Sequence, residues 1–282
     1  WWNKDDRYSR QVLTGDLEKI RTFYMNRGYL DFDIKNTTVS ISETKKNVYI
    51  AIIIDEGNKY TFGDIKISGK YYPLTEESIF QKDIKTKKGE VFSRKLLNES
   101  TESINQELGN YGYAFSNVNP IPDVDKENLI VGFNYFIEPG KKVYVRRISF
   151  VGNEKTKDKV LRREMRQFEA SYYDKEKIDQ STRRLKRTQY FEGVDIKTVS
   201  VPGISDQVDL TVAVKEKNTG SVKLGAGASS DEGIVGSFSV TQANFLGTGN
   251  TLSATINTSS VNTIYSISHI DPYYTLDGIS RR

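Results

Sequence analysis

Apolar residues recur at intervals of three, four and seven at three places in the first 190 positions, which is the spacing of a buried helix face. Each such helix is followed by a turn and then by a strand-like segment. The three faces lie about eighty positions apart, with Ile20, Ile104 and Leu185 at equivalent places. The full faces are Leu17, Ile20 and Tyr24; Leu97, Ile104, Leu108 and Tyr111; and Ile178 and Leu185. A fixed period of this length predicts three copies of one structural unit.

Strand patterns and glycines follow the same period and give the order of elements in a unit. Gly69 and Gly152 end two matching strand–turn–strand segments and lie 83 residues apart. Each complete unit is predicted as β-α-α-β-β, an α+β fold in which two helices cover one face of an antiparallel sheet. The predicted elements are strands 62–68 and 143–151, short helices 75–84 and 156–165, long helices 93–110 and 174–188, and hairpin strands 115–122, 129–137, 193–200 and 207–214. The first unit has only its long helix and hairpin, at about 14–56.

Local chemistry predicts where the helices of these units begin and end. Thr75 and Thr156 are expected to cap the short helices, with acidic residues behind them that complement the helix dipole. Gly28 and Gly112 are expected to end the long helices in the left-handed region, where glycine avoids a side-chain clash. The third unit has Gln189 at this point, so its junction is predicted to be the least regular of the three.

The sequence changes in character after about residue 218. Only seven residues from 219 to 282 are charged, and four short segments alternate apolar residues with Gly, Ser and Thr. These segments are 221–229, 234–240, 251–257 and 265–268. Such weak alternation is typical of antiparallel strands in a transmembrane β-barrel, and it fits a soluble β-sandwich equally well. Because four strands cannot close a barrel, a barrel requires further strands outside this chain.

Composition bears on chemistry and on partners. Cysteine is absent and His269 is the only histidine, so we expect no catalytic residue, no metal site and no cofactor. Residues 141–217 contain 19 basic and 12 acidic side chains, a net charge of +7, whereas residues 1–140 carry −2. The basic runs 161–166 and 183–187 suit anionic lipid or an acidic partner. They also suggest a nucleic-acid-binding array, but aromatic residues are not interleaved with them as stacking platforms, which argues against nucleic acid.

Four longer motifs carry a specific resemblance. They are VLRREMRQFEASYYD at 160–174, VPGISDQVDLTVAVKEKNTGSVKLGAG at 201–227, NFLGTGN at 244–250 and DPYYTLDGIS at 271–280. In this order they resemble the BamA family, barrel proteins that fold and insert outer-membrane β-barrel proteins in Gram-negative bacteria. The resemblance implies that the β-α-α-β-β units are POTRA domains and that a transmembrane barrel follows them.

The resemblance also implies a division of the chain and a function. Residues 1–57 correspond to part of the third POTRA domain, 58–140 to the fourth, 141–218 to the fifth, and 219–282 to the first four strands of an incomplete barrel. The implied protein lies in the outer membrane with its POTRA domains in the periplasm, is the central component of the assembly machinery, and is not an enzyme. A related POTRA-containing secretion or translocation porin is the alternative.

The implied partners are Bam lipoproteins, unfolded outer-membrane protein clients and outer-membrane lipid. Among the lipoproteins, BamD is expected at the fifth POTRA domain and others at the third. Arg163, Arg166 and Glu169 are the candidate docking residues, and Glu169 is favoured as an ion-pair partner. Three aromatic residues near strand ends, Phe245, Tyr273 and Tyr274, are expected at the membrane interface.

Two kinds of strand pairing are predicted. An exposed sheet edge offers free N–H and C=O groups to an extended client, and the expected edges are about 34–41, 115–122 and 193–200. Pro120 and Pro122 blunt the second edge, so pairing is expected at the first, along Ile34, Thr37, Val39 and Ile41. The resemblance also implies a lateral seam formed by the first barrel strand, with Val222, Leu224, Gly225 and Gly227 as its residues.

Overall fold

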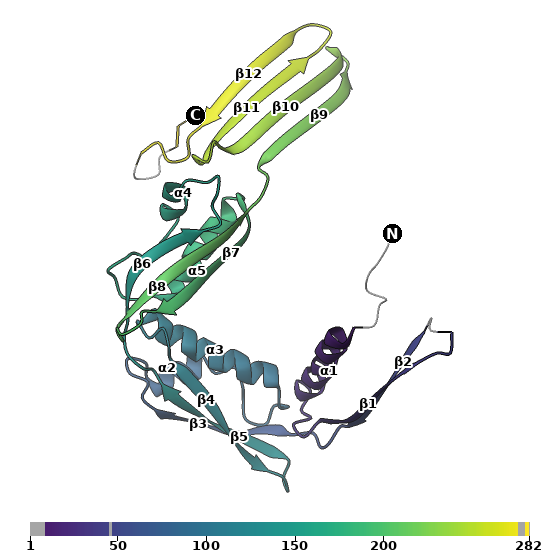
Figure 1. Ribbon diagram of the computed structural model, residues 1–282, viewed down its shortest axis with the longest axis vertical. Coiled ribbons are helices and arrows are strands. Elements are labelled where there is room, and N and C mark those ends of the chain that lie inside the picture. The colour runs from purple at the N-terminus through teal and green to yellow at the C-terminus, as the bar shows by residue number, and fades with distance from the viewer. Residues whose placement is uncertain (1–8, 45–46, 276–279, 282) are drawn as a thin grey trace. The chain divides into compact units, whose positions relative to one another are not determined.

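The structure is a computed structural model that describes residues 9–44, 47–275 and 280–281 (Figure 1). Residues 1–8 of the predicted first part and residues 276–279 of the last sequence motif lie outside the described residues. The chain forms two compact bodies, Trp1–Gly109 with Phe115–Gly140, and Asn110–Ala114 with Lys141–Arg282. Three structural repeats and a four-stranded antiparallel sheet are distributed between them.

The first repeat, in the first body, consists of a long helix and a hairpin, as predicted. The elements are α1 (Arg10–Met25), β1 (Asp33–Ile41) and β2 (Val48–Asp55), and the two strands pair antiparallel. The helix is held by aromatic packing, since Tyr24 stacks on Phe32 with ring centroids 4.3 Å apart. No residue of α1 is fully buried, because within the described residues this repeat has no third strand and no second helix to complete a core.

The second repeat completes the first body and has the full set of elements. They are β3 (Thr61–Gly69), α2 (Glu76–Lys82), α3 (Arg94–Asn110), β4 (Asn117–Asp125) and β5 (Ile130–Glu138). The sheet order is β3-β5-β4, with β3 parallel to β5 and β4 antiparallel to it. The core contains the rings of Phe62, Phe92 and Phe133, 5.4–6.0 Å apart, and the fully buried Ile104 and Leu108 of α3.

The third repeat, in the second body, has the same topology. Its elements are β6 (Tyr144–Val151), α4 (Asp158–Arg162), α5 (Lys175–Arg187), β7 (Phe191–Ser200) and β8 (Gln207–Glu216), in the sheet order β6-β8-β7. Ile178 and Leu185 of α5 are buried on the sheet beside Leu210 and Val212 of β8. In both complete repeats the opening strand pairs parallel with the last strand. The expectation of a purely antiparallel sheet was therefore wrong. Two helices and one strand lie between the opening strand and the last strand of each repeat, and this long connection permits the two to pair in parallel.

Single hydrogen bonds repeat together with the fold. The backbone N–H of Lys85 donates to Ser100 Oγ at 2.9 Å, and the N–H of Arg166, 81 positions later, donates to Ser181 Oγ at 2.8 Å. Both serines are fully buried, and each hydroxyl donates back to a helix carbonyl. The predicted repeat is thus confirmed at the level of individual polar contacts.

Glycine marks the end of each opening strand for a steric reason. Gly69 and Gly152 have φ angles of +95° and +83°, and a Cβ at either place would collide with the carbonyl oxygen of the neighbouring strand, at Ile137 or Val214. No other residue fits this close approach without moving the backbone.

The ends of the helices confirm most of the predicted caps and glycine turns. Gly28 and Gly112 have φ angles of +103° and +99°. Gln189 adopts the left-handed region as well, with φ +61°, so the third junction keeps the turn although a side chain makes it less favourable by roughly 1–2 kcal/mol. Thr75 caps α2 through a capping box with Ser78.

Two sequence predictions about single residues were wrong. Thr156 does not cap α4, whose N-cap is Lys157 without a side-chain hydrogen bond; the Thr156 hydroxyl instead accepts a hydrogen bond from Asn244 at 2.8 Å. Tyr111 does not belong to the buried helix face. It follows the last residue of α3 and is 44% exposed, because the chain leaves the helix axis at the glycine turn.

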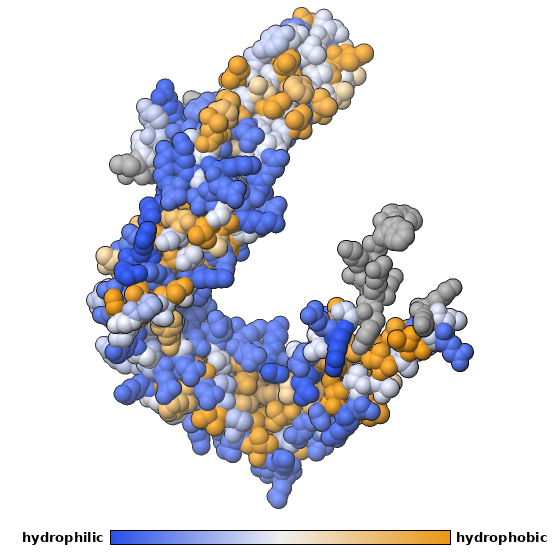
Figure 2. Space-filling model, in the orientation of Figure 1, coloured by the Kyte–Doolittle hydropathy of each residue, from blue (hydrophilic) through white to orange (hydrophobic). Residues whose placement is uncertain are grey.

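The second body ends in a four-stranded antiparallel sheet. Its strands are β9 (Gly220–Ser229), β10 (Gly233–Phe245), β11 (Asn250–Thr258) and β12 (Thr263–Ile270), in the order β12-β11-β10-β9. The register places Leu224 opposite Phe238, Phe238 opposite Ile256 and Ile256 opposite Tyr265, so these side chains share one face. Hydrophobic residues are visible over this sheet in Figure 2.

This sheet has an apolar face that is open to solvent, with Leu224 and Ile267 each 81% exposed. Within the described residues this sheet has four strands and is hydrogen-bonded to no other sheet. None of the helices in the described part of the chain has the length and apolar character needed to cross a membrane.

Candidate functional site

The edge of β1 carries the predicted pairing residues. The N–H of Ser42, just beyond β1, donates to the carbonyl oxygen of Asn47, just before β2, at 2.9 Å, so this N–H points toward β2. Because successive N–H groups of a strand point to opposite sides, the N–H of Thr38 points toward β2 and that of Val39 toward the open edge. Ile34, Thr37 and Val39 are half-buried, and Ile41 is 65% exposed.

The edge of β4 is unsuitable for pairing along its centre. Pro120 and Pro122 lie opposite Tyr135 and Phe133 in an unbroken antiparallel ladder with β5. We infer that both proline nitrogens point to the open side, since a proline facing β5 would interrupt that ladder. An incoming strand would find no donor at either position.

The third predicted edge, β7, is also the end strand of its sheet. It begins with a bulge between Phe191 and Gly193, and an ion pair of 2.7 Å joins Glu192 to Lys215 on β8. That contact lowers the pKa of the Glu192 carboxyl through the hydrogen bond from Lys215. Bulges and charges of this kind protect an edge from unwanted pairing.

The predicted seam residues all lie on β9, which is the edge strand of the four-stranded sheet. Val222 and Leu224 belong to its apolar face, while Gly225 and Gly227 face the other side. A Cβ at Gly225 would lie 2.5 Å from Ser237 Oγ, so this glycine already permits a close side-chain approach between β9 and β10.

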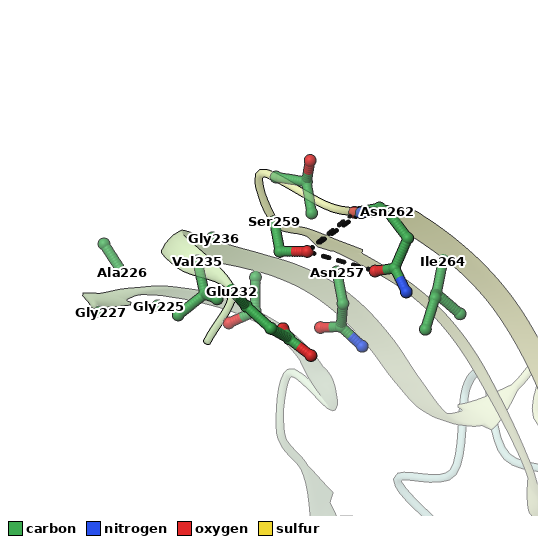
Figure 3. Close-up of a pocket in the computed structure, with 12 residues that line it drawn as sticks. Gly225, Ala226, Gly227, Glu232, Val235, Gly236, Asn257, Ser259, Asn262 and Ile264 are labelled. Carbon is green, nitrogen blue, oxygen red and sulfur yellow. Dashed lines mark hydrogen bonds between the residues drawn. The ribbon is translucent and has the colours of Figure 1, made fainter. Parts of the chain in front are cut away.

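The side of the sheet that carries these glycines is hollowed. A depression of about 470 Å³ lies between β9–β10 residues such as Gly225 and Val235 and β11–β12 residues such as Asn257 and Ile264 (Figure 3). Ser259 donates to Asn262 at its rim. Its lining has no set of converging charged groups that would mark a small-molecule site.

The three predicted docking residues are not brought together as one surface. Glu169 has a 41% exposed side chain; its Oε1 accepts from the Ile148 N–H at 2.7 Å and lies 3.4 Å from Arg162. Arg166 is half-buried and donates to its neighbouring carbonyl, at Met165. Arg163 is only 19% exposed, and its guanidinium lies 4.1 Å above the ring of Tyr273.

Arg163 belongs to a junction that the sequence analysis missed. Glu164, with an 8% exposed side chain, pairs with Arg184 of α5 at 2.9 Å, and Arg184 also donates to the Tyr273 hydroxyl at 2.9 Å. Tyr273 follows β12, so this network joins the third repeat to the strand region. In the second repeat the equivalent positions, 81 residues earlier, are Asp83 and Ser103, and the Ser103 hydroxyl donates to the Asp83 carboxylate at 2.7 Å. Aligning the repeats by charge would have exposed this difference.

The turn between β10 and β11 makes the second part of the junction. Lys157 N–H donates to Gly247 O at 2.9 Å, and the Tyr190 hydroxyl donates to Gly249 O at 3.0 Å. Burial raises the pKa of the Tyr190 hydroxyl. Glu216, just before β9, accepts from the N–H groups of Lys155 and Thr156. Burial acts to raise the pKa of Glu216, but these hydrogen bonds outweigh it and the net shift is downward.

The three aromatic residues predicted at the membrane interface differ in their surroundings. Phe245 is half-buried at the end of β10. Tyr273 faces α5 of the third repeat, as described above. Tyr274 is 57% exposed, with the guanidinium of Arg281 4.9 Å from its ring. In the described part of the chain no group of three or more acidic, histidine or cysteine side chains is arranged to hold a metal ion.

Comparison with known proteins matches this repeat architecture. The family model described as POTRA, surface antigen variable number repeat, matches residues 2–57, 60–140 and 143–217. The chain belongs to the POTRA family. The outer membrane protein assembly factor BamA of Neisseria meningitidis is 35% identical over 280 residues, which cover 99% of this chain and 35% of that protein. BamA of Buchnera aphidicola is 32% identical over 276 residues, covering 97% of this chain and 44% of that protein.

Solved structures agree with the sequence relatives. Haemophilus ducreyi BamA lacking POTRA domains 1–3 gives a TM-score of 0.68 at 35% identity, covering 78% of this chain and 41% of that one. The POTRA3–5 fragment of Haemophilus influenzae BamA gives 0.69 at 30% identity, covering 77% and 84%. The predicted resemblance to BamA is confirmed, as is the fold class of POTRA repeats followed by antiparallel strands. The chain spans less than half the length of the curated relatives described above.

A matched pair of proline substitutions tests the edge of β1. Val39→Pro removes an outward N–H and should abolish capture of an extended peptide at this POTRA repeat while the hairpin remains folded. Thr38→Pro removes a hydrogen bond to β2 and should instead destabilise the hairpin, by about 1–3 kcal/mol. Peptide crosslinking and circular dichroism of both variants check this. Unchanged peptide capture by the Val39 variant would contradict an edge-pairing role.

A pair of tyrosine substitutions tests the junction between the POTRA repeat and the strand region. Tyr273→Ala removes both the hydrogen bond to Arg184 and the contact with Arg163, so the distance distribution between spin labels on α5 (Lys186→Cys) and β11 (Thr251→Cys) should broaden. The chain contains no cysteine, so the two introduced cysteines are the only labelling sites in it. Tyr274→Ala, at the exposed neighbouring ring, is the control and should leave the distribution unchanged. Equal widths for the two variants would show that the Tyr273 contacts do not hold the junction.

Proposed function

We propose that this chain forms the third to fifth POTRA domains and the first barrel strands of an outer-membrane protein assembly factor of the BamA type. On this proposal residues 1–57, 58–140 and 141–218 are the POTRA domains, and residues 219–282 open the barrel. The observation that carries it is continuity: β8 of the last POTRA repeat leads within four residues into β9, the edge strand of a sheet with an exposed apolar face. The POTRA domains would lie in the periplasm and the strands in the outer membrane.

The proposed function is templated strand pairing, not catalysis. An unfolded outer-membrane client would add its strands to free backbone groups, first at a POTRA edge such as β1 and then at the seam along β9. Small residues at Gly225 and Gly227 would ease the separation of the seam. The named relatives favour an assembly factor over a secretion porin or a nucleic-acid-binding array.

The proposed partners are clients, lipid and lipoproteins. Basic side chains of the third repeat that are exposed on α5, Arg183, Lys186 and Arg187, suit anionic lipid headgroups. Lipoprotein docking, by BamD at the third repeat and by others at the first, would use exposed groups. Of Arg163, Arg166 and Glu169, the burial of the two arginines leaves Glu169 as the strongest candidate.

Locking the seam tests the function as a whole. A cysteine replacing Leu224 on β9, paired with a cysteine on the strand that closes the barrel in the complete protein, should stop client assembly under oxidising conditions. Reduction should restore it, because only the covalent link prevents the seam from opening. Leu224→Cys alone is the control. Normal assembly by the fully locked protein would refute the seam mechanism.

Charge reversal tests docking. Glu169→Lys should weaken the complex with the lipoprotein about tenfold or more, because a favourable ion pair becomes a repulsive one. Glu154→Lys, at another exposed acidic residue of the same repeat, should leave the affinity unchanged. Titration by fluorescence anisotropy measures both, and equal affinities for the two variants would assign docking elsewhere.

A further inference from the structure

Glu169 and Arg162 occupy the open edge of β6 as a strand would. Glu169 Oε1 accepts from the Ile148 N–H at 2.7 Å, and Arg162 donates to the Ile148 carbonyl at 3.3 Å. Both backbone groups of Ile148 therefore point away from β8, toward the outer side of the sheet. The side chains that bind them also form an ion pair with each other, at 3.4 Å.

The same edge is already paired by backbone a few residues earlier. Val145 accepts from the Ala170 N–H at 2.7 Å, and its own N–H donates to Ser171 O at 2.9 Å. The loop that leaves α4 thus pairs with Val145, and Glu169 continues that pairing through its side chain at Ile148. Alternation along the strand turns the N–H and C=O of Phe150 to the same open side.

The second repeat provides an internal comparison. Its loop pairs with Phe62 of β3 through the backbone of Gly89 and Glu90, as the third-repeat loop does with Val145. At the position of Glu169, however, it has Lys88, which bonds to the carboxylate of Asp64 at 2.6 Å. A lysine cannot accept a hydrogen bond from a backbone N–H. Side-chain capping of the edge is therefore a feature of the third repeat.

We propose that the β6 edge at Ile148 and Phe150 is a second strand-pairing site, closed by the Glu169–Arg162 pair and taken by an extended segment of an unfolded barrel client when that pair is displaced. The proposal rests on the function proposed above. It extends strand pairing from the hairpin strand β1 to the opening strand β6, whose edge is covered by the side chains of Glu169 and Arg162.

Three observations favour a client strand as the occupant. A depression of about 720 Å³ runs beside Ile148 and Phe150 and is bounded across from them by Asp158 and Arg162 of α4, so the edge has open space next to it. Both capping side chains are about half-exposed, at 41% and 50%, so solvent competes for them and a partner can displace them. The sheet that contains β6 also leads directly into the barrel strands, through β8 and β9.

Three substitutions of Glu169 separate edge capping from docking. Alanine and lysine remove the acceptor for the Ile148 N–H, whereas glutamine keeps an acceptor but loses the charge. Hydrogen exchange at the Ile148 amide should accelerate at least tenfold in Glu169→Ala and stay near the wild-type rate in Glu169→Gln. Docking that depends on charge would be weakened by all three.

The probe for the opened edge is a synthetic peptide with the sequence of residues 250–258, NTLSATINT, one of the barrel strands. The protein carries a single crosslinking cysteine in place of Ser149 on β6. In the complete protein we expect at least fivefold more crosslinking in the Glu169→Ala background than in the Glu169→Gln background. Adding Phe150→Pro should remove this gain, because it deletes an outward N–H that β8 does not use. Equal crosslinking in the alanine and glutamine backgrounds, or unchanged exchange at Ile148, would overturn the proposal.

A crosslinking cysteine at Ser40 on β1 distinguishes the two possible failures. Crosslinking at β1 without any at β6 would reject this inference alone. Crosslinking at neither edge would count against strand pairing by these repeats altogether. Capture of a second copy of the chain at β6, in place of the peptide, would reject a client as the occupant.

Discussion

The structure depends on how the backbone N–H and C=O groups at the edges of its β-sheets find hydrogen-bond partners. A three-stranded POTRA sheet has two edges, and each exposes N–H and C=O groups that must bind water, a side chain or another strand. Prolines remove the donors along β4, and backbone from the following loops pairs with Phe62 and Val145 on the opening strands. Within the described residues, β1 and β9 are edge strands, and the far end of β6 is paired by side chains rather than by a strand; these are edges that a strand-pairing protein would need to keep available.

The second and third repeats share one backbone fold but differ in a few side chains, and these side chains give the repeats different contacts. The buried contact between Asp83 and Ser103 is internal to the second repeat, where it tethers two helices. The equivalent Glu164 and Arg184 of the third repeat instead extend to Tyr273. Glu164 has an 8% exposed side chain, and a carboxylate buried without its partner is unfavourable, so Glu164 depends on Arg184 staying in place. The repeat that adjoins the strand region is thus the one that carries a polar network to hold it.

On the two proposals above, lipoprotein docking and capping of the β6 edge would both use the Glu169 carboxylate. It satisfies the Ile148 N–H and pairs with Arg162, yet it is also the most accessible of the candidate docking groups. A partner that draws this carboxylate away leaves a backbone donor and its carbonyl unpaired, and these are the groups an extended strand satisfies. Docking and strand capture would then be linked thermodynamically, each favouring the other.

The sequence by itself determined whatever depends on local periodicity. The recurring apolar faces predicted three repeats, the alternating segments predicted four strands, and Gly28, Gly112 and Thr75 predicted how particular helices end or begin. Contacts between distant residues were decided only by the tertiary structure. Thr156 has the right local context for a cap, but its hydroxyl is taken by Asn244, 88 positions away. Arg163 belongs to a basic run that resembles a docking surface, and the structure turns it inward onto Tyr273. Local pattern fixes which face of an element is apolar, because that follows from backbone geometry; it does not fix which polar group meets which, because that depends on how separate elements pack.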